Sequence, residues 1–230
     1  MNRSKKINVI KLDRHIIPTE YEITYDAIED KSLKKLPSNI RDNIKELYYS
    51  ALKRPEESIP RLNELIKKYP DVSVFQNYLS AAYWSLGDTK KADEVVIEGY
   101  KRHPDYLFAK INYAQICLHN KEFEKIPEIF DNKFDLKALY PKRNKFHYTE
   151  FVGFMYTICQ YFIGIGEWDD ADVYYKILKK IAPWNKKTRM LKRILYPSIS
   201  KRFLKRLIEY LDKKSKEHEK SIQNNNTKKG

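Results

Sequence analysis

Glycine and cysteine are scarce in this chain. Of its 230 residues, six are glycine and two are cysteine. Little glycine together with abundant Leu, Ile, Lys and Glu favours helices and provides no glycine-rich phosphate loop. The two cysteines, Cys117 and Cys159, have no nearby Cys or His at ligand spacing, so we expect neither a disulfide nor a metal site. Both fit a reducing compartment and fall at apolar helical positions, where cysteine packs as a small apolar residue.

The sequence also lacks a long hydrophobic run. Its most apolar stretch, residues 151–166, is shorter than the roughly 20 residues that span a bilayer and contains Gln160. The first fifteen residues are basic, without the sustained apolar run of a signal peptide. We therefore expect a cytoplasmic protein without a transmembrane segment.

Residues with the spacing of a catalytic site are missing as well. The five histidines are scattered, and no Ser, Cys or carboxylate stands where it would form a nucleophile and base pair. No metal signature is present. We expect a protein that is not an enzyme and that uses no cofactor.

Positive charge is abundant and concentrated. The formal net charge is +14, and the segment from Lys186 to Gly230 holds 15 Lys and Arg against 4 Asp and Glu. A strong positive field attracts nucleic acid, anionic membranes or acidic proteins. The alternative is that frequent Lys, Asn, Ile and Tyr reflect background composition.

The clearest pattern lies in residues 72–106 and predicts two short helices folded on each other. Apolar residues recur every three or four positions, as on one face of a helix, at Phe75, Leu79, Ala82, Tyr83 and Leu86. Gly87 permits a tight helix exit, and Asp88 or Thr89 can cap the next helix. That second helix has small or apolar residues at Ala92, Val95, Val96 and Gly99 before Pro104 ends it.

With Ser73 as first position, this segment resembles a tetratricopeptide repeat of 34 residues. The matching residues are Leu79, Ser80, Tyr83, Gly87, Ala92, Val96, Gly99 and Pro104. A unit beginning at Val152 matches in the same way, at Ile158, Cys159, Phe162, Gly166, Trp168, Ala171, Tyr175, Leu178 and Pro183. Gln76 replaces the aromatic residue usual at the fourth position. The resemblance implies an all-α, right-handed solenoid of about four helix pairs over residues 37–196.

Two further units and an insertion complete this array. Residues 39–70 fit a degenerate first repeat, whose second helix opens at Pro55. Residues 107–140 fit a third repeat, with matches at Tyr113, Ala114, Cys117, Phe123, Ile126 and Phe130. An insertion of residues 134–150 follows, in which aromatic residues alternate with Lys142, Arg143 and Lys145. This mixture suits a nucleic-acid patch, or a connector whose aromatic side chains pack into the array.

The two ends of the chain do not follow the repeat. Residues 1–36 form an arm in which residues 20–26 alternate as in an extended segment. Since we expect no sheet, the arm is either disordered or packed on the helical array, partly covering it. At the other end we expect a helix from Lys186, with Met190, Leu191, Ile194 and Leu195 facing inward, then a basic amphipathic capping helix over residues 197–221 and a disordered tail over 222–230. The capping helix would present Lys201, Arg202, Lys205 and Arg206 to nucleic acid, an acidic partner or an anionic membrane.

The resemblance also implies a concave, apolar and aromatic groove that binds a partner peptide or the chain's own arm. Its residues would be Asn77, Ala81, Trp84, Phe108, Ile111, Asn112, Gln115, His119, Tyr156 and Gln160. Relatives that bind the carboxylate end of chaperone tails use a set of lysine, asparagine and arginine residues, of which only Asn112 matches. We therefore expect a non-catalytic adaptor that binds proteins through this groove. The alternative is a nucleic-acid-associated adaptor that uses the insertion and the basic C-terminal helices.

Overall fold

A computed structural model describes residues 4–11, 16–28 and 31–197 of the chain. The chain divides into two compact units, Met1–Pro183 and Trp184–Gly230, and each is described by itself. The expected capping helix (197–221), its cations Lys201, Arg202, Lys205 and Arg206, and the tail (222–230) lie outside the described residues, except for Pro197.

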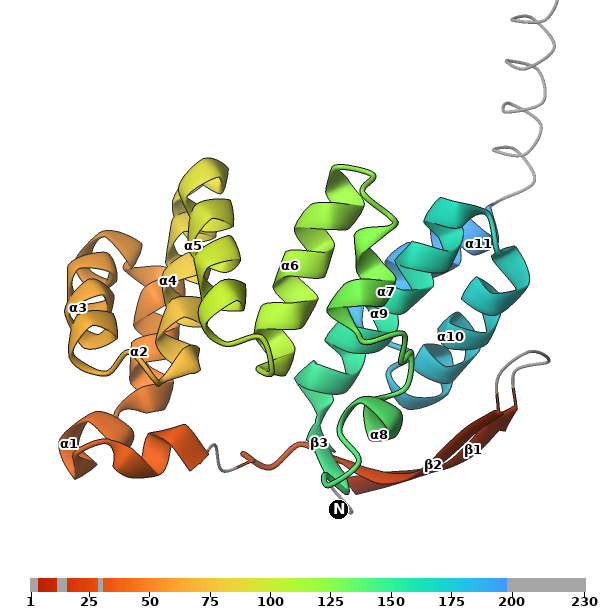
Figure 1. Cartoon of the computed structure of the whole chain (residues 1–230), viewed down its shortest axis with the longest axis horizontal. Helices are drawn as coiled ribbons and strands as arrows, with labels where there is room; N and C mark the ends of the chain where they lie inside the picture. Colours follow the sequence, from red (N-terminus) through yellow and green to blue (C-terminus); the bar gives the residue numbers. More distant parts are fainter. Residues whose placement is uncertain (1–3, 12–15, 29–30, 198–230) are drawn as a thin grey trace, which may run out of the picture. The chain divides into compact units, whose positions relative to one another are not determined.

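Antiparallel helices that follow one another in pairs make up most of the first unit (Figure 1). After a 3-10 helix, η1 (Lys31–Lys35), and a short α1 (Ser38–Arg41), the pairs are α2 (Ile44–Lys53) with α3 (Pro55–Lys68), α4 (Ser73–Leu86) with α5 (Thr89–Arg102), α6 (Leu107–His119) with the short α7 (Lys125–Ile129), and α9 (Tyr148–Ile165) with α10 (Trp168–Ile181). The expectation of a mainly helical protein is confirmed.

In three of these pairs, the first helix ends with the same backbone turn. Gly87 and Gly166 follow α4 and α9 with φ of 78° and 85°, in the left-handed region that glycine enters without steric cost. Lys121, after α6, has φ of 61°. At each turn the next residue's N–H donates to the carbonyl five residues back, with N···O distances of 2.8–3.0 Å. Positions 87 and 121 differ by 34, the length of the predicted repeat. The structure thus shows the same helix end at Lys121, where the residue type did not indicate it.

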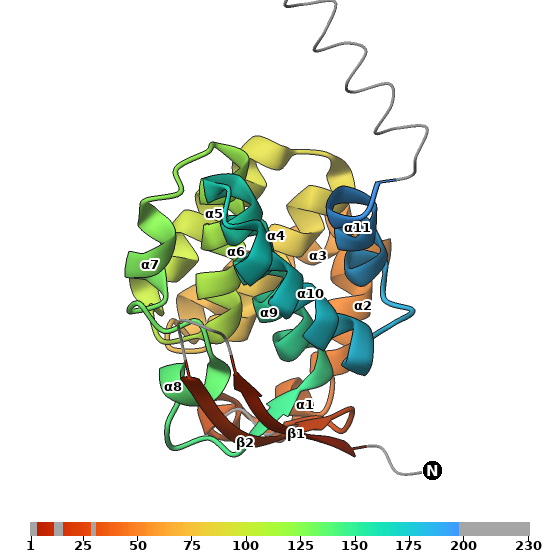
Figure 2. The same ribbon diagram turned by 90° about the vertical axis from the view of Figure 1, so that its right-hand side faces the viewer.

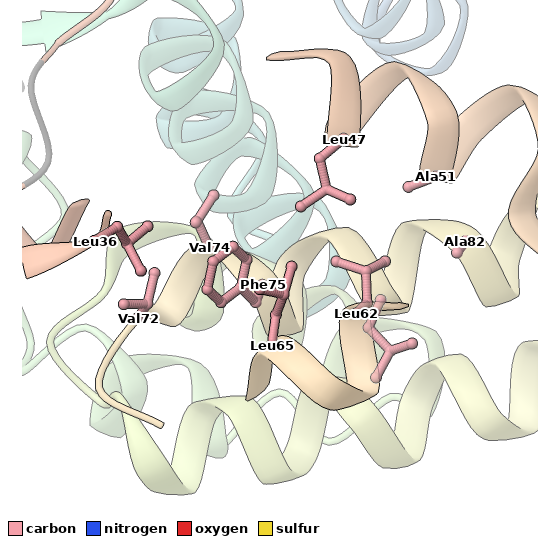
Figure 3. Close-up of a cluster of buried hydrophobic side chains, with 10 residues drawn as sticks. Leu36, Leu47, Ala51, Leu62, Leu65, Val72, Val74, Phe75 and Ala82 are labelled. Carbon is pink, nitrogen blue, oxygen red and sulfur yellow. The ribbon is translucent and has the colours of Figure 1, made fainter. Parts of the chain in front are cut away.

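The N-terminal helices α2, α3 and α4 share a continuous apolar core. Side chains from α2, α3 and α4 meet there with Leu36, which follows η1, and Val72, which precedes α4 (Figure 3). The cluster consists of Leu36, Leu47, Ala51, Leu62, Leu65, Val72, Val74, Phe75, Leu79 and Ala82. As predicted, Pro55 is the first residue of α3, where its missing N–H needs no partner, and Glu56 and Glu57 lie in the first turn. Proline and acidic residues thus start a helix whose apolar face is buried against its neighbours.

A small sheet joins the arm to the insertion. Strands β1 (Ser4–Lys11) and β2 (Ile16–Thr24) form an antiparallel hairpin, and β3 (Lys145–His147) pairs with β2 in parallel, in the order β1-β2-β3. The short α8 (Leu136–Leu139) packs beside β2 (Figure 2). The extended arm segment is therefore confirmed as a strand, but the expectation that it has no sheet to join is wrong. β2 pairs on one side with β1 and on the other with β3, a three-residue strand more than a hundred residues later that is too short to be recognised from alternation.

In the second unit, the described helix is α11 (Lys186–Leu195). It begins where expected, after Asn185, whose side chain accepts a hydrogen bond from the Lys187 N–H. The inward direction expected for Met190 and Ile194 is wrong, because both side chains are exposed, by 40% and 44%. The buried face instead includes Thr188 and Leu191. The buried face thus includes a polar residue, Thr188, which the apolar pattern did not indicate.

Candidate functional site

A row of amide side chains connects three helices of the first unit. Asn112 on α6 donates from Nδ2 to Oδ1 of Asn77 on α4, at 2.8 Å. Gln115, one turn further along α6, donates from Nε2 to Oε1 of Gln160 and to Oγ1 of Thr157 on α9, at 3.0 and 2.8 Å. Asn112 and Gln115 are three residues apart and therefore lie on the same face of α6. From this face Asn112 reaches α4, and Gln115 reaches α9. We name these five side chains the amide row.

The amide row is neutral and retains hydrogen-bonding capacity. A side-chain amide offers two donor hydrogens and a carbonyl oxygen with two lone pairs. The observed bonds leave donor capacity at Asn77 and Gln160 and acceptor capacity at Asn112 and Gln115. All four residues are half-buried, and none carries a charge. Such a row can bind groups that both donate and accept, such as the main chain of an extended peptide.

The other predicted groove residues divide into an accessible and a buried group. Trp84 and His119 are exposed, while Ala81 and Phe108 are half-buried. Ile111 and Tyr156 are buried, so they cannot line the groove as expected. Ile111 lies against Gly153, where an added Cβ would come within 3.3 Å of its Cδ1, and burial raises the pKa of the Tyr156 hydroxyl. Close approach of α6 and α9 thus encloses the apolar side chains and leaves amides at the surface.

Gln76, at the position where the repeat usually has an aromatic residue, borders two cavities. One, with a volume of about 10 Å³, lies between α4, α5 and α6 and also touches Asn77 and Asn112. The other, of about 290 Å³, is an open depression between α3, α4 and α5. The side-chain oxygen Oε1 of Gln76 is buried without a hydrogen-bond partner. Gly99 faces this side chain, where an added Cβ would lie 3.4 Å from Oε1, which explains the small residue expected at that position.

Two cations of the insertion, Arg143 and Lys145, have partners within the protein. The Arg143 guanidinium donates to both carboxylate oxygens of Glu150, at 3.1 and 2.8 Å, and lies 4.3 Å from the centre of the buried Phe146 ring. The Lys145 ammonium pairs with Glu22 of β2 at 3.3 Å. Lys142 is exposed. Arg143 thus makes its contacts within the insertion, and Lys145 links the insertion to the arm. This geometry does not favour the predicted anion-binding patch.

A buried carboxyl group lies where the insertion meets its neighbours. Asp135 is only 6% exposed and caps α8 by accepting hydrogen bonds from the N–H groups of Lys137 and Ala138, both at 2.9 Å. Burial raises its pKa to about 6, although the backbone hydrogen bonds oppose the shift. The negative charge of Asp135 also raises the pKa of Tyr21 on β2 and of Tyr174 on α10, after burial itself. Sequence reasoning missed this junction, although an Asp before a short helix is an N-cap signal.

Both cysteines are buried within helices as predicted, with free thiols. Burial raises the pKa of Cys117 to about 11 and of Cys159 to about 12, so both stay protonated at neutral pH. The described part of the chain contains no group of three or more His, Cys, Asp or Glu side chains that could hold a metal ion. In the same residues, no helix has the length and apolar character needed to cross a bilayer.

Comparison with known proteins gives little further guidance. No protein-family model matches the chain, and no curated protein matches it. Among solved structures, the chain is similar to "MamA RS-1 ArsTM double mutant", with 14% sequence identity and a TM-score of 0.45, over 81% of this chain and 97% of that chain. A similarity of this size carries no conclusion about function.

Proposed function

We propose that this protein is a non-catalytic scaffold that binds an extended segment of a partner protein along the amide row. In this proposal the helix pairs form a right-handed array of about four tetratricopeptide-like repeats, and α4, α6 and α9 line its concave face. The amide row is the observation that carries the proposal, because its bonds join one helix from each of three successive pairs. The two buried, protonated thiols suit a cytoplasmic setting.

The chemistry of the row indicates which kind of partner it binds. Neutral amides match the N–H and C=O groups of a peptide main chain, which every sequence carries. Trp84 and Phe108, near the row in the predicted groove, would add contacts with apolar side chains of the partner. Because no charged residue belongs to the row, binding should depend little on salt.

The arm has a docking site of its own. β2 pairs with β3 in the register Glu22↔Lys145, Ile23↔Phe146 and Thr24↔His147, and the ring of Tyr21 contacts that of Phe146 with centroids 5.1 Å apart. This arrangement supports intramolecular docking of the arm on the insertion. The amide row then serves an external partner. The alternative of a nucleic-acid adaptor receives no support from the insertion, because Arg143 and Lys145 are paired.

Selection from a yeast-displayed library of random unstructured peptides tests the proposal. We expect the full chain to enrich peptides whose binding falls at least about tenfold in Asn112→Leu, since an unpaired buried polar group or lost hydrogen bond costs about 1–3 kcal/mol. Asn63→Leu is the matched control, because Asn63 is an exposed helical amide on α3, outside the row. Binding should be similar at low and moderate salt.

Two results would contradict the proposal. One is enrichment of peptides that bind Asn112→Leu as well as the unmodified chain. The other is affinity that falls steeply with salt, which would indicate an electrostatic surface elsewhere.

A further inference from the structure

The segment around α11 exposes an unusual set of side chains. Trp184, just before the helix, is 86% exposed, although tryptophan is among the residues most often buried on average. Met190 and Ile194 are exposed by 40% and 44%. Residues 184–197 contain five Lys and Arg and no Asp or Glu. The surface thus combines apolar groups with positive charge.

Helix geometry brings the exposed cations and aliphatic residues of α11 together on one face. Lys186, Met190 and Ile194 are four residues apart, so they form one row along α11. Arg189 and Arg193, also four apart, form the adjacent row, since each lies three residues from a member of the first. All five side chains are exposed. The opposite face carries the buried Thr188 and Leu191.

We propose that the exposed face of α11, with Trp184, binds the surface of an anionic phospholipid membrane. Arginine and lysine attract the negative headgroups, and their long apolar stems let them stay charged at the interface while neighbouring residues insert. Tryptophan partitions to the headgroup level, and methionine and isoleucine reach the acyl chains just below. This second surface is independent of the amide row and would bring the scaffold and its partner to a membrane.

The aliphatic residues favour a membrane over a nucleic acid. Phosphate groups of a nucleic acid would pair with the arginines, and bases could stack on Trp184. Exposed Met190 and Ile194, however, gain nothing from contact with phosphate, and lie among the cations rather than apart from them. Burial of such side chains in an acyl layer is favourable by about 0.8 kcal/mol for each CH₂ group, which raises the membrane affinity about fourfold.

Trp184 fluorescence offers a direct test in the full chain. Trp84 and Trp168 are replaced by Phe, which leaves Trp184 as the single tryptophan. We expect its emission to move to shorter wavelength, and the protein to sediment, with vesicles of phosphatidylcholine mixed with phosphatidylserine. Vesicles of phosphatidylcholine alone should produce much weaker effects, because the electrostatic attraction is missing.

Two paired variants separate the apolar and charged contributions. Met190→Ser with Ile194→Ser should weaken vesicle binding at least about tenfold at unchanged net charge. Arg189→Gln with Arg193→Gln should weaken it about 25-fold, at about fivefold for each charge near the surface. Lys67→Gln with Lys101→Gln removes the same charge from exposed positions on α3 and α5 and should leave binding close to that of the unmodified chain.

Three outcomes would overturn the proposal. The first is Trp184 emission that does not respond to anionic vesicles. The second is vesicle binding that the α11 variants leave unchanged, which would assign it to another part of the chain. The third is binding of a single-stranded RNA oligonucleotide that displaces the vesicles and depends on the arginines but not on Met190 or Ile194, which would make the surface a nucleic-acid interface.

Discussion

Replacing Asp135 with Asn should stabilise the protein, and the gain should depend on pH. Asn is as good an N-cap as Asp, so the substitution keeps the acceptor for the α8 backbone N–H groups and removes only the ionisable group. In the folded protein burial raises the pKa of Asp135 to about 6, above its ordinary value of 3.8. The folded state therefore holds the proton more tightly than the unfolded state, and ionisation of Asp135 opposes folding.

The size of the effect follows from the two pKa values. A raised pKa makes the stability of the native protein fall as pH rises from about 4 to about 6, because the unfolded chain has already lost the proton. With one pKa unit equal to about 1.4 kcal/mol, the ionised carboxylate costs about 3 kcal/mol at pH 7 and about 0.5 kcal/mol at pH 4. Asp135→Asn should thus be more stabilising at pH 7 than at pH 4. Any cost of burying the Asn N–H groups is independent of pH, so the change with pH isolates the carboxylate.

Urea unfolding followed by circular dichroism at several pH values measures this difference. Asp88→Asn provides a control of opposite sign, because Asp88 also caps a helix but is accessible, and hydrogen bonds from Lys91 lower its pKa. Its lowered pKa stabilises the folded state above the usual aspartate pKa, and this contribution is lost on acidification. A gain for Asp135→Asn that is equal at every pH, or that grows as pH falls, would refute the reasoning.

Two further substitutions test the helix ends. Lys121→Gly should stabilise the protein by about 0.5–1 kcal/mol, because the relief of left-handed strain outweighs the larger conformational entropy of glycine in the unfolded chain. Lys179→Gly, at an exposed position within α10, should instead cost about 1 kcal/mol. Equal losses of stability in urea unfolding for both variants would contradict the shared helix end. Lys110→Met should destabilise by about 1–2 kcal/mol, since the buried Lys110 ammonium donates to the Ile129 carbonyl at 2.6 Å. Unchanged thermal and urea unfolding for Lys110→Met would show that this bond contributes no stability.

Local signals in the sequence accounted for helix starts and ends. Gly87 and Gly166 end α4 and α9, and Pro55 opens α3, where the residue types predict them. Each of these depends on a few neighbouring residues and on backbone conformations that few residue types adopt. The helix end at Lys121 was not predicted, because lysine gives no signal for a left-handed turn. It could be found only from the backbone conformation.

The candidate site was predictable only in part. The resemblance predicted a groove with Asn77, Asn112, Gln115 and Gln160, which the structure joins by hydrogen bonds. It also included Ile111 and Tyr156, which the structure buries. Repeat positions give the average direction of a side chain. How closely α6 approaches α9, at Gly153, decides which of these side chains remain accessible.

By itself, the sequence determined the helical content and the helix boundaries at Pro55, Gly87 and Gly166, because both follow from the apolar periodicity and caps within a few residues. Only the tertiary structure decided that Asn77 bonds Asn112, that Gln115 bonds Thr157 and Gln160, and that the arm pairs with β3. Partners in these contacts are tens of residues or more apart, so their meeting depends on how the helices pack and not on local preference. In the second unit, Met190 and Ile194 are exposed on α11, where apolar periodicity alone predicts burial.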